Sequence, residues 1–133
     1  MNKKIKYKNV LCQYCQEKAI VIQGKVIYGE THKLSDLEFY YCEPCAAWVG
    51  MHKHNKKPFG TLANNELRRK RAIAHKAFDV FWRGKENQAE VRKAEYAWLA
   101  DVMGVAVEDC HIGMFNIEQC NKVITTCLKR LGK

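Results

Sequence analysis

The sequence has no long apolar run, no low-complexity tract and no internal repeat beyond a doubled Cys-x-x-Cys motif. No apolar segment approaches the length that a bilayer span requires. The lysine-rich segment 1–9 is not followed by the apolar stretch of a signal peptide. We therefore expect a cytoplasmic protein without membrane contact, in a compartment where thiols stay reduced and paired cysteines tend to bind metal.

Familiar catalytic motifs are also missing. The chain contains no nucleophile elbow, no phosphate-binding loop and no carboxylate cluster suited to magnesium. An active site needs several such groups in one place, so an enzyme is disfavoured. One catalytic hypothesis remains: His75 and Asp79, four residues apart, could act with His111 in a cryptic hydrolase or nuclease. The same spacing is also that of an ordinary helix-stabilising pair.

Acidic residues are scarce in the middle of the chain. The formal net charge is +9, from 23 basic and 14 acidic residues. Residues 50–86 carry ten basic and three acidic groups, a net of +7, whereas residues 87–133 carry six of each. Such a concentration favours contact with a polyanion, although lysine-rich surfaces also serve solubility alone. The predicted nucleic-acid-binding residues are Lys53, Lys56, Lys57, Arg68, Arg69, Arg71 and Lys76.

Four of the seven cysteines form two close pairs, Cys12/Cys15 and Cys42/Cys45, separated by 26 residues. Two such turns supply the four ligands of a tetrahedral Zn²⁺ site. Four thiolates leave no open position, so we predict one structural zinc ion rather than a catalytic one. His52 or His54 could replace one cysteine, but four sulfurs are favoured. The other three cysteines suit a hydrophobic core better than a second metal site.

The distribution of elements predicts an α+β fold. Residues 1–58 are expected to form a four-cysteine zinc ribbon built from β-hairpins, with one hairpin turning at Gln23–Gly24. Residues 59–133 are expected to form a three-helix unit packed with the ribbon in one compact body. The first helix is expected from residue 64 or 65 to 82 or 83. The next two are expected to begin with capping boxes at 87–90 and 116–119.

The ordered motifs resemble a zinc-finger-containing domain family of phages and prophages. The matching stretches are Cys12-x-Tyr14-Cys15, Cys42-x-Pro44-Cys45-x-Ala47-Trp48-Val49-Gly50-x-His52 and Cys110-His111-Ile112-Gly113-Met114-Phe115. The family is of unknown function, so the resemblance implies zinc and a mobile-element origin, without an activity. It adds weight to five residues as functional candidates: Trp48, His52, His75, Asp79 and His111.

Three functional hypotheses follow. The favoured one is a small phage-type accessory protein of a bacterial host that binds nucleic acid through its basic loop and helix. The second is a protein-interaction module acting on a host or phage enzyme. The third is the cryptic hydrolase or nuclease described above.

Overall fold

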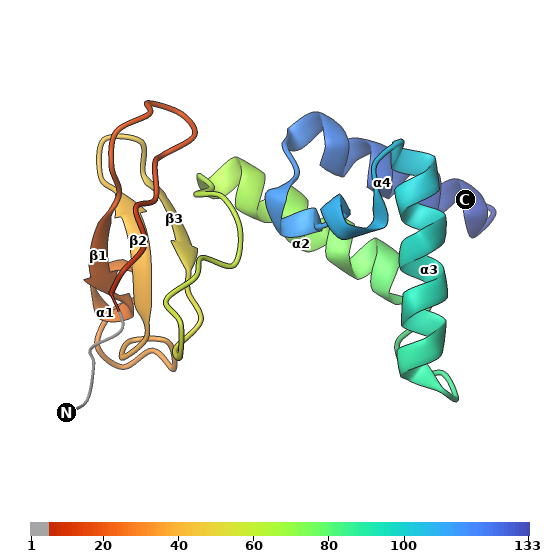
Figure 1. Cartoon of the computed structure of the whole chain (residues 1–133), viewed down its shortest axis with the longest axis horizontal. Helices are drawn as coiled ribbons and strands as arrows, with labels where there is room; N and C mark the ends of the chain where they lie inside the picture. The colour runs from red at the N-terminus through yellow and green to blue at the C-terminus, as the bar shows by residue number, and fades with distance from the viewer. Residues whose placement is uncertain (1–5) are drawn as a thin grey trace. The chain divides into compact units, whose positions relative to one another are not determined.

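The computed structural model describes residues 6–133, and the chain divides into two compact units (Figure 1). The first unit ends at Asn65, and the second comprises Glu66–Lys133. A three-stranded sheet lies in the first unit, and the long helices belong to the second. The prediction of an α+β fold is confirmed. The first five residues of the predicted ribbon segment lie outside the described residues.

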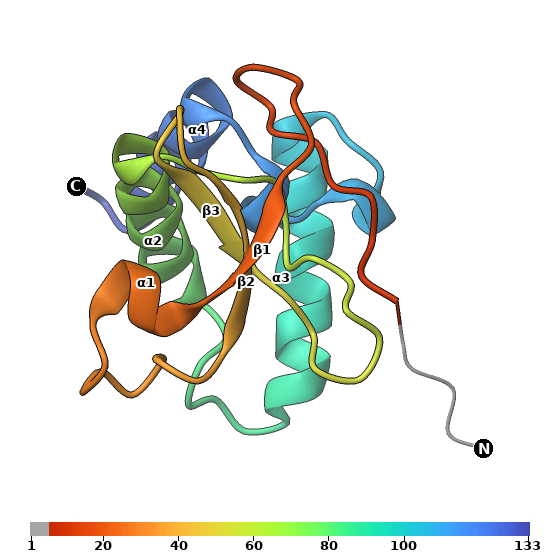
Figure 2. The same ribbon diagram turned by 90° about the vertical axis from the view of Figure 1, so that its left-hand side faces the viewer.

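The sheet of unit 1 is antiparallel, in the order β1–β2–β3. Its strands are β1 (Ile20–Gln23), β2 (Glu38–Cys42) and β3 (Ala47–Gly50), seen side by side in Figure 2. Tyr40 on the central strand lies opposite Val21 and Val49, and only 1% of its surface is exposed. Around it gathers a small core that also includes two of the paired cysteines, Cys12 and Cys42.

The predicted hairpin at Gln23–Gly24 is wrong. Residues Gly24–Tyr28 form the short helix α1, and β1 pairs with β2 instead. Gly24 is required by a close approach rather than by a tight turn. A Cβ atom there would lie 1.9 Å from the carbonyl oxygen of Leu34, and the Gly24 amide donates to Leu37 O at 2.7 Å. The segment 34–37 therefore packs against Gly24, and the strand that pairs with β1 begins after it, at Glu38.

Unit 2 contains the helices α2 (Asn65–Asp79), α3 (Gln88–Met103) and α4 (Ile117–Arg130). Two short 3₁₀ helices, η1 (Val107–Asp109) and η2 (Ile112–Met114), connect the last two. Buried side chains from α2, α3, η2, α4 and the residues that follow the two 3₁₀ helices supply the core: Leu67, Ala74, Phe78, Leu99, Ala100, Cys110, Ile112, Phe115, Cys120, Val123 and Cys127. Among the described residues, none of the helices combines the length and apolarity needed to cross a bilayer.

The helix boundaries partly follow the sequence signals. The α4 capping box is present: the Asn116 side chain accepts from the Gln119 amide, and Gln119 caps Asn116 in return. The box expected for α3 is absent, because Asn87 has a left-handed φ of 54° and makes no side-chain cap. Helix α2 ends at Asp79, earlier than predicted. The residues after it form hydrogen-bonded turns, in which, for example, Phe81 N donates to Phe78 O at 3.1 Å.

Candidate metal centre

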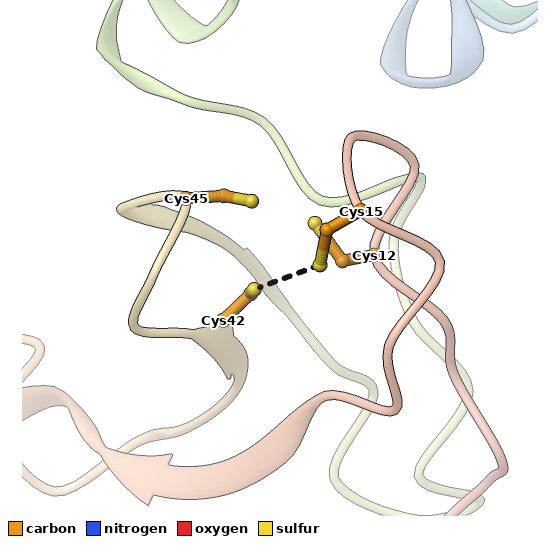
Figure 3. A group of neighbouring side chains, drawn as sticks. All are labelled: Cys12, Cys15, Cys42 and Cys45. Atoms are coloured by element: carbon orange, nitrogen blue, oxygen red, sulfur yellow. Dashed lines mark hydrogen bonds between the residues drawn. The ribbon is translucent and has the colours of Figure 1, made fainter.

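Two turns bring four cysteines together in unit 1. Cys12 and Cys15 lie on a loop between Leu11 and Lys18, which form an isolated bridge. Cys42 ends β2, and Cys45 lies in the turn that leads into β3. Figure 3 shows the side chains of both pairs directed toward one point between the two turns. The sequence alone thus predicted which residues meet, and the two hairpin ends supply the scaffold.

The spacing of the sulfurs fits a zinc ion. All four Sγ atoms lie within 4.8 Å of one another, and Cys15 Sγ is 3.6 Å from Cys42 Sγ. A tetrahedral Zn²⁺ with Zn–S bonds of about 2.3 Å places its sulfurs about 3.8 Å apart. The four thiols therefore stand close to the corners of such a tetrahedron. One structural zinc ion held by Cys12, Cys15, Cys42 and Cys45 would cross-link the two turns, with no coordination position left for a substrate.

Burial and the neighbouring groups shift the pKa of three of the four cysteine thiols. Burial raises the pKa of the Cys42 thiol, and burial with the neighbouring thiols raises the pKa of Cys45 to about 12. Burial also acts to raise the pKa of Cys12, but the amides of Tyr14 and Cys15 donate to its sulfur, and the net pKa is lowered. Zn²⁺ binding must therefore displace protons from the thiols of Cys42 and Cys45, whose pKa values are raised.

No second metal site accompanies this one within residues 6–133. The four paired cysteines are the only group of metal-ligating side chains that converge there. Cys110, Cys120 and Cys127 are buried in unit 2, and burial raises the pKa of each thiol. His52 is also outside the cluster, since its ring packs against Phe59 with centroids 4.4 Å apart.

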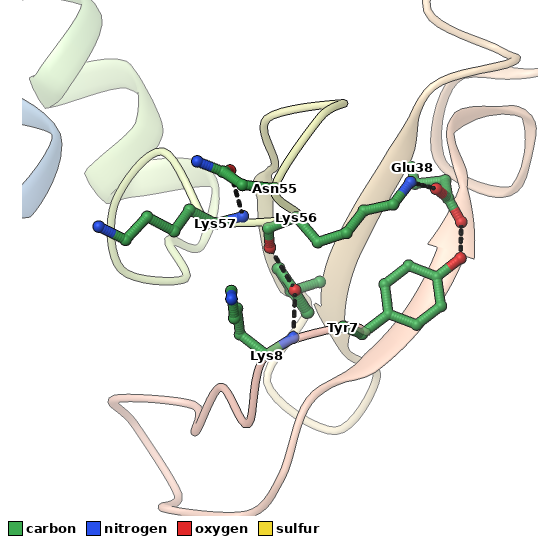
Figure 4. A network of polar contacts seen from close by, with 7 residues as sticks. Tyr7, Lys8, Glu38, Asn55, Lys56 and Lys57 are labelled. Carbon is green, nitrogen blue, oxygen red and sulfur yellow. Dashed lines mark hydrogen bonds and ion pairs between the residues drawn. The ribbon is translucent and has the colours of Figure 1, made fainter. Parts of the chain in front are cut away.

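The predicted basic loop follows β3. Its ends are joined by a bridge between Met51 and Pro58. Lys53 and Lys57 are exposed on it. Lys56 instead turns inward to Glu38, with Nζ 2.8 Å from Oε1 (Figure 4). Two of the three predicted loop lysines are thus available to solvent, and the third is a tether.

The predicted nucleic-acid-binding residues of α2 also differ in their exposure to solvent. Arg69 and Lys76 are exposed, and Arg68 is half-buried. Arg71 is buried, with 8% of its surface exposed, and its Nε donates to Phe115 O at 3.0 Å. Arg71 therefore joins α2 to the segment before α4, and its burial corrects the prediction that it is exposed for contact with nucleic acid.

The remaining candidates have separate partners. Trp48 Nε1 donates to the hydroxyl of Tyr28 at 3.1 Å, inside an aromatic cluster. His75 Nδ1 lies 3.0 Å from Arg71 O. The carboxylate of Asp79 accepts from Trp82 Nε1 and Arg83, each at 3.0 Å. His111 is exposed beside a cavity of unit 2. The contacts of His75 and Asp79 thus satisfy local backbone and side-chain groups.

Two positioning residues escaped sequence reasoning. The Tyr40 hydroxyl donates to Lys56 O at 2.6 Å and accepts from Lys8 N at 2.8 Å, which fixes the basic loop to the sheet. The amide of Gln13, between the first two cysteines, donates to Leu62 O and to Thr61 Oγ1. Neither role has a sequence signature, because the hydrogen-bond partners of Tyr40 and of Gln13 lie far from them along the chain.

The sheet, the paired turns and the four-cysteine centre define a small zinc-ribbon protein with an added helical unit. A family described as a zinc-finger-containing domain matches residues 8–130. The chain belongs to this family. Neither the characterised proteins nor the solved structures that were compared contain a match.

Proposed function

We propose that this protein binds nucleic acid, with zinc in a purely structural role. The observation that carries the proposal is the basic loop, residues 51–59, where exposed lysines stand beside an exposed aromatic ring. Lys53 and Lys57 are exposed, and 60% of the Phe59 surface is accessible. Lysines of this kind neutralise phosphates, and exposed rings stack on bases, which is how proteins hold single strands.

The loop is held in shape by contacts inside unit 1. His52 N donates to Lys57 O at 2.8 Å, and Lys56 N donates to His52 O at 2.9 Å. Behind them the buried Tyr40 hydroxyl binds the Lys56 carbonyl. A loop ordered before binding loses less conformational entropy on binding. The tethers therefore support a preformed surface for a ligand.

Zinc supports the same surface from the opposite end of β3. Cys45 lies in the turn that leads into that strand, and the basic loop follows the strand's last residue, Gly50. The small core of unit 1 contains two of the ligand cysteines. Loss of zinc should therefore loosen the sheet and weaken nucleic-acid binding without any contact between the ion and the ligand.

Fluorescence anisotropy with labelled single-stranded DNA, single-stranded RNA and duplex DNA tests the proposal. The zinc-loaded protein should bind, and the logarithm of the association constant should fall linearly with the logarithm of salt concentration. The double variant Lys53→Glu/Lys57→Glu should bind far more weakly and with a smaller salt slope. Phe59→Ala should cost about 1 to 3 kcal/mol of binding to single strands and less for duplex.

The matched control reverses two other exposed lysines of the same unit, in Lys25→Glu/Lys33→Glu. It changes the net charge equally but spares the loop, so it should retain most of the affinity. Equal losses of nucleic-acid affinity in the two double variants would show that net charge alone determines binding. If the protein binds none of the three ligands at low salt, the proposal is wrong. Arg69→Glu/Lys76→Glu tests the α2 contribution in the same assay.

A second candidate function is protein interaction, and one observation favours it. Ile73 and Val80 lie seven residues apart on and just after α2, and 44% and 49% of their surfaces are exposed. Contiguous exposed apolar side chains mark surfaces that bind protein partners. The parent protein should then bind a partner protein in a complex that resists nuclease treatment. The substitution Ile73→Glu should disrupt that complex and leave the binding of oligonucleotides unchanged. Nuclease-sensitive association would favour the first function.

A further inference from the structure

A cavity of about 250 Å³ opens on the surface of unit 2, and none of its lining residues was used above for nucleic-acid binding. Helix α3 contributes Arg92, Lys93 and Tyr96 to its wall. The connection between α3 and α4 contributes Val107, Cys110 and His111. Cys110 and His111 belong to the Cys-His-Ile-Gly-Met-Phe motif, to which neither the zinc centre nor the basic loop gives a role.

The wall of this cavity is cationic. Arg92 and Lys93 carry permanent positive charge, and His111 adds ring nitrogens that donate or accept hydrogen bonds. None of the lining residues is acidic. Residues 87–133 have no net charge as a whole, so this local excess is invisible in the sequence count. The composition of the wall therefore selects for an anion.

The Arg92 guanidinium is held in place before any ligand arrives. Its central carbon lies 5.2 Å from the Trp82 ring centroid and 4.7 Å from that of Tyr96. Arg92 also makes a side-chain hydrogen bond to Tyr96. The guanidinium has five N–H donors, and those that remain form a planar fork that matches phosphate oxygens. Trp82 is itself fixed by its hydrogen bond to Asp79. Arg92 is exposed, and its contacts with the two rings orient the guanidinium at the mouth of the cavity.

Carboxylates also lie near the wall. Glu108 and Asp109 lie in the chain between the lining residues Val107 and Cys110, but both are exposed and neither lines the cavity. Asp79 is close enough to Tyr96 to contribute to the raised pKa of that phenol, which burial raises most. Both Asp79 oxygens already accept hydrogen bonds, from Trp82 and from Arg83. The Arg83 ion pair offsets the carboxylate charge, so Asp79 holds Trp82 without cancelling the cationic character of the cavity.

Size and chemistry limit what the cavity can take. Pockets for drug-sized ligands measure about 300 to 1,000 Å³, so this one suits a smaller group. Val107, with 51% of its surface exposed, adds an apolar edge. Cys110 is 1% exposed, and burial raises the pKa of its thiol, so it offers no ready nucleophile. The features together favour binding over covalent chemistry.

We propose that this cavity binds a terminal phosphate monoester. In this site Arg92 and Lys93 contact the phosphate oxygens, and a ring nitrogen of His111 hydrogen-bonds to the ligand. The ligand has two possible sources of the same chemistry, a free nucleoside monophosphate or the phosphorylated end of a nucleic-acid strand. The site goes beyond the basic loop and does not depend on the proposed function of that loop.

Calorimetry and amide NMR shifts of the full zinc-loaded chain test the site with AMP, adenosine and inorganic phosphate. AMP should shift the amides of Val107, Cys110 and His111, and inorganic phosphate should compete with it. Adenosine should leave them unmoved. Lys93→Glu should weaken AMP binding at least about tenfold, the loss of one charge-assisted hydrogen bond. Arg92→Lys, which keeps the charge but removes the fork, should also weaken it.

The control variant is Lys122→Glu, an exposed lysine of α4 outside the cavity wall. It should bind AMP within about twofold of the parent, because the Debye length near 0.15 M salt is only about 8 Å. Thermal unfolding should confirm that Lys93→Glu and His111→Gln remain folded. Equal binding of AMP and adenosine, equal losses in Lys93→Glu and Lys122→Glu, or no AMP shift at millimolar concentration would overturn the proposal.

A last comparison separates the sources and the two proposals. If the parent protein binds a 5′-phosphorylated oligonucleotide more tightly than its 5′-hydroxyl form, and Lys93→Glu removes this difference, the ligand is a phosphorylated strand end. AMP binding without that difference identifies a free nucleotide. If Lys53→Glu/Lys57→Glu abolishes oligonucleotide binding while AMP still binds, both sites stand and are independent. If oligonucleotides never bind but AMP does, only the function of the basic loop fails.

Discussion

Gln16 and Ala46 occupy equivalent places in the two zinc-binding turns, and both have a left-handed backbone, with φ of 65° and 48°. Each directly follows the second cysteine of its pair. Gln16 N donates to Cys12 O at 2.8 Å, and Ala46 N donates to Glu43 O at 3.1 Å. The two turns thus reverse the chain after their second cysteine through the same unusual backbone conformation.

Replacing Ala46 by glycine should stabilise the zinc-loaded protein. A left-handed L-residue costs about 1 to 2 kcal/mol, and glycine loses only about 0.5 to 1 kcal/mol of extra backbone entropy on folding. The net gain should be about 0.5 to 1 kcal/mol in urea unfolding. Ala72→Gly, on the exposed face of α2, is the control and should destabilise by about 1 kcal/mol. Destabilisation of both to the same degree would mean that Ala46 is unstrained.

Zinc removal should unfold the sheet of unit 1. Metal analysis of the purified chain should give one zinc per molecule, since structural sites of this type contribute about 10 to 16 kcal/mol to folding. Cys42→Ser should lose the metal and the dispersed β-strand amide signals. Cys127→Ala removes a thiol that is also buried but lies outside the cluster, so it should retain the zinc. Protein that keeps its sheet after chelation would contradict the structural role.

The metal centre could be predicted from the sequence because its ligands are encoded by local spacing. Two residues between cysteines place both sulfurs on one turn, and only the meeting of the two turns is non-local. The α4 capping box is local in the same way. The prediction of a turn at Gln23–Gly24 was wrong because glycine allows both a tight turn and a close approach of another segment, and a sequence does not distinguish the two. The real constraint at Gly24 is the carbonyl of Leu34, ten residues ahead.

Burial of charge was the other failure. Arg71 shares its neighbourhood with Arg68, Arg69 and Lys70, so charge counting assigned it to the nucleic-acid-binding residues. Only the helical rotation that directs it to Phe115, 44 residues away, distinguishes it. Likewise, α3 and the connection that follows it both contribute residues to the wall of the phosphate cavity, and no count of charge along the chain marks these residues as one site. Charge density along a chain reports composition, whereas a site depends on which residues meet in space.

The two arginines of α2 should therefore respond differently to substitution. Arg71→Met leaves the buried Phe115 carbonyl without its donor and should destabilise the protein by about 1 to 3 kcal/mol. Arg69→Met, on the exposed face, should change stability by less than about 0.5 kcal/mol. Urea unfolding measures both. In binding assays Arg69→Met should weaken nucleic-acid affinity more than Arg71→Met does, and the reverse order would restore Arg71 to the binding surface.

Gly24 should tolerate no side chain. In Gly24→Ala the new methyl would meet a backbone carbonyl at 1.9 Å, and backbone atoms yield less easily than side chains. We expect a loss on the order of 3 kcal/mol in the free energy of unfolding. Gly104→Ala is the comparison, because Gly104 has φ of 70° with no atom within 4 Å of an added Cβ. Strain alone should cost about 1 kcal/mol there, and similar losses at both sites would argue against the close approach of segment 34–37.

The ion pair that tethers the basic loop should give the fold a defined pH dependence. Hydrogen bonds from Lys56 and then Tyr7 lower the pKa of the Glu38 carboxyl, and the Glu38 bond raises the pKa of Lys56. Glu38 therefore stabilises the fold at pH values above its unfolded pKa of about 4.3, and this contribution is lost as the pH falls through the lowered native value. Lys56 contributes below its unfolded pKa of about 10.4 and loses its contribution as the pH rises through the raised native value.

Carbon-13 NMR of the Glu38 carboxyl, recorded in excess zinc, measures this coupling directly. Its titration midpoint should lie below the ordinary value in the parent and move upward in Lys56→Met, because the largest cause of the shift is gone. Lys53→Met removes a lysine from the same loop that lies on its exposed side, so the Glu38 midpoint should stay where it is in the parent. If Lys53→Met shifts the midpoint as much as Lys56→Met does, the general charge of the loop sets the Glu38 pKa. The Lys56–Glu38 bond would then not be the tether that holds the loop to β2.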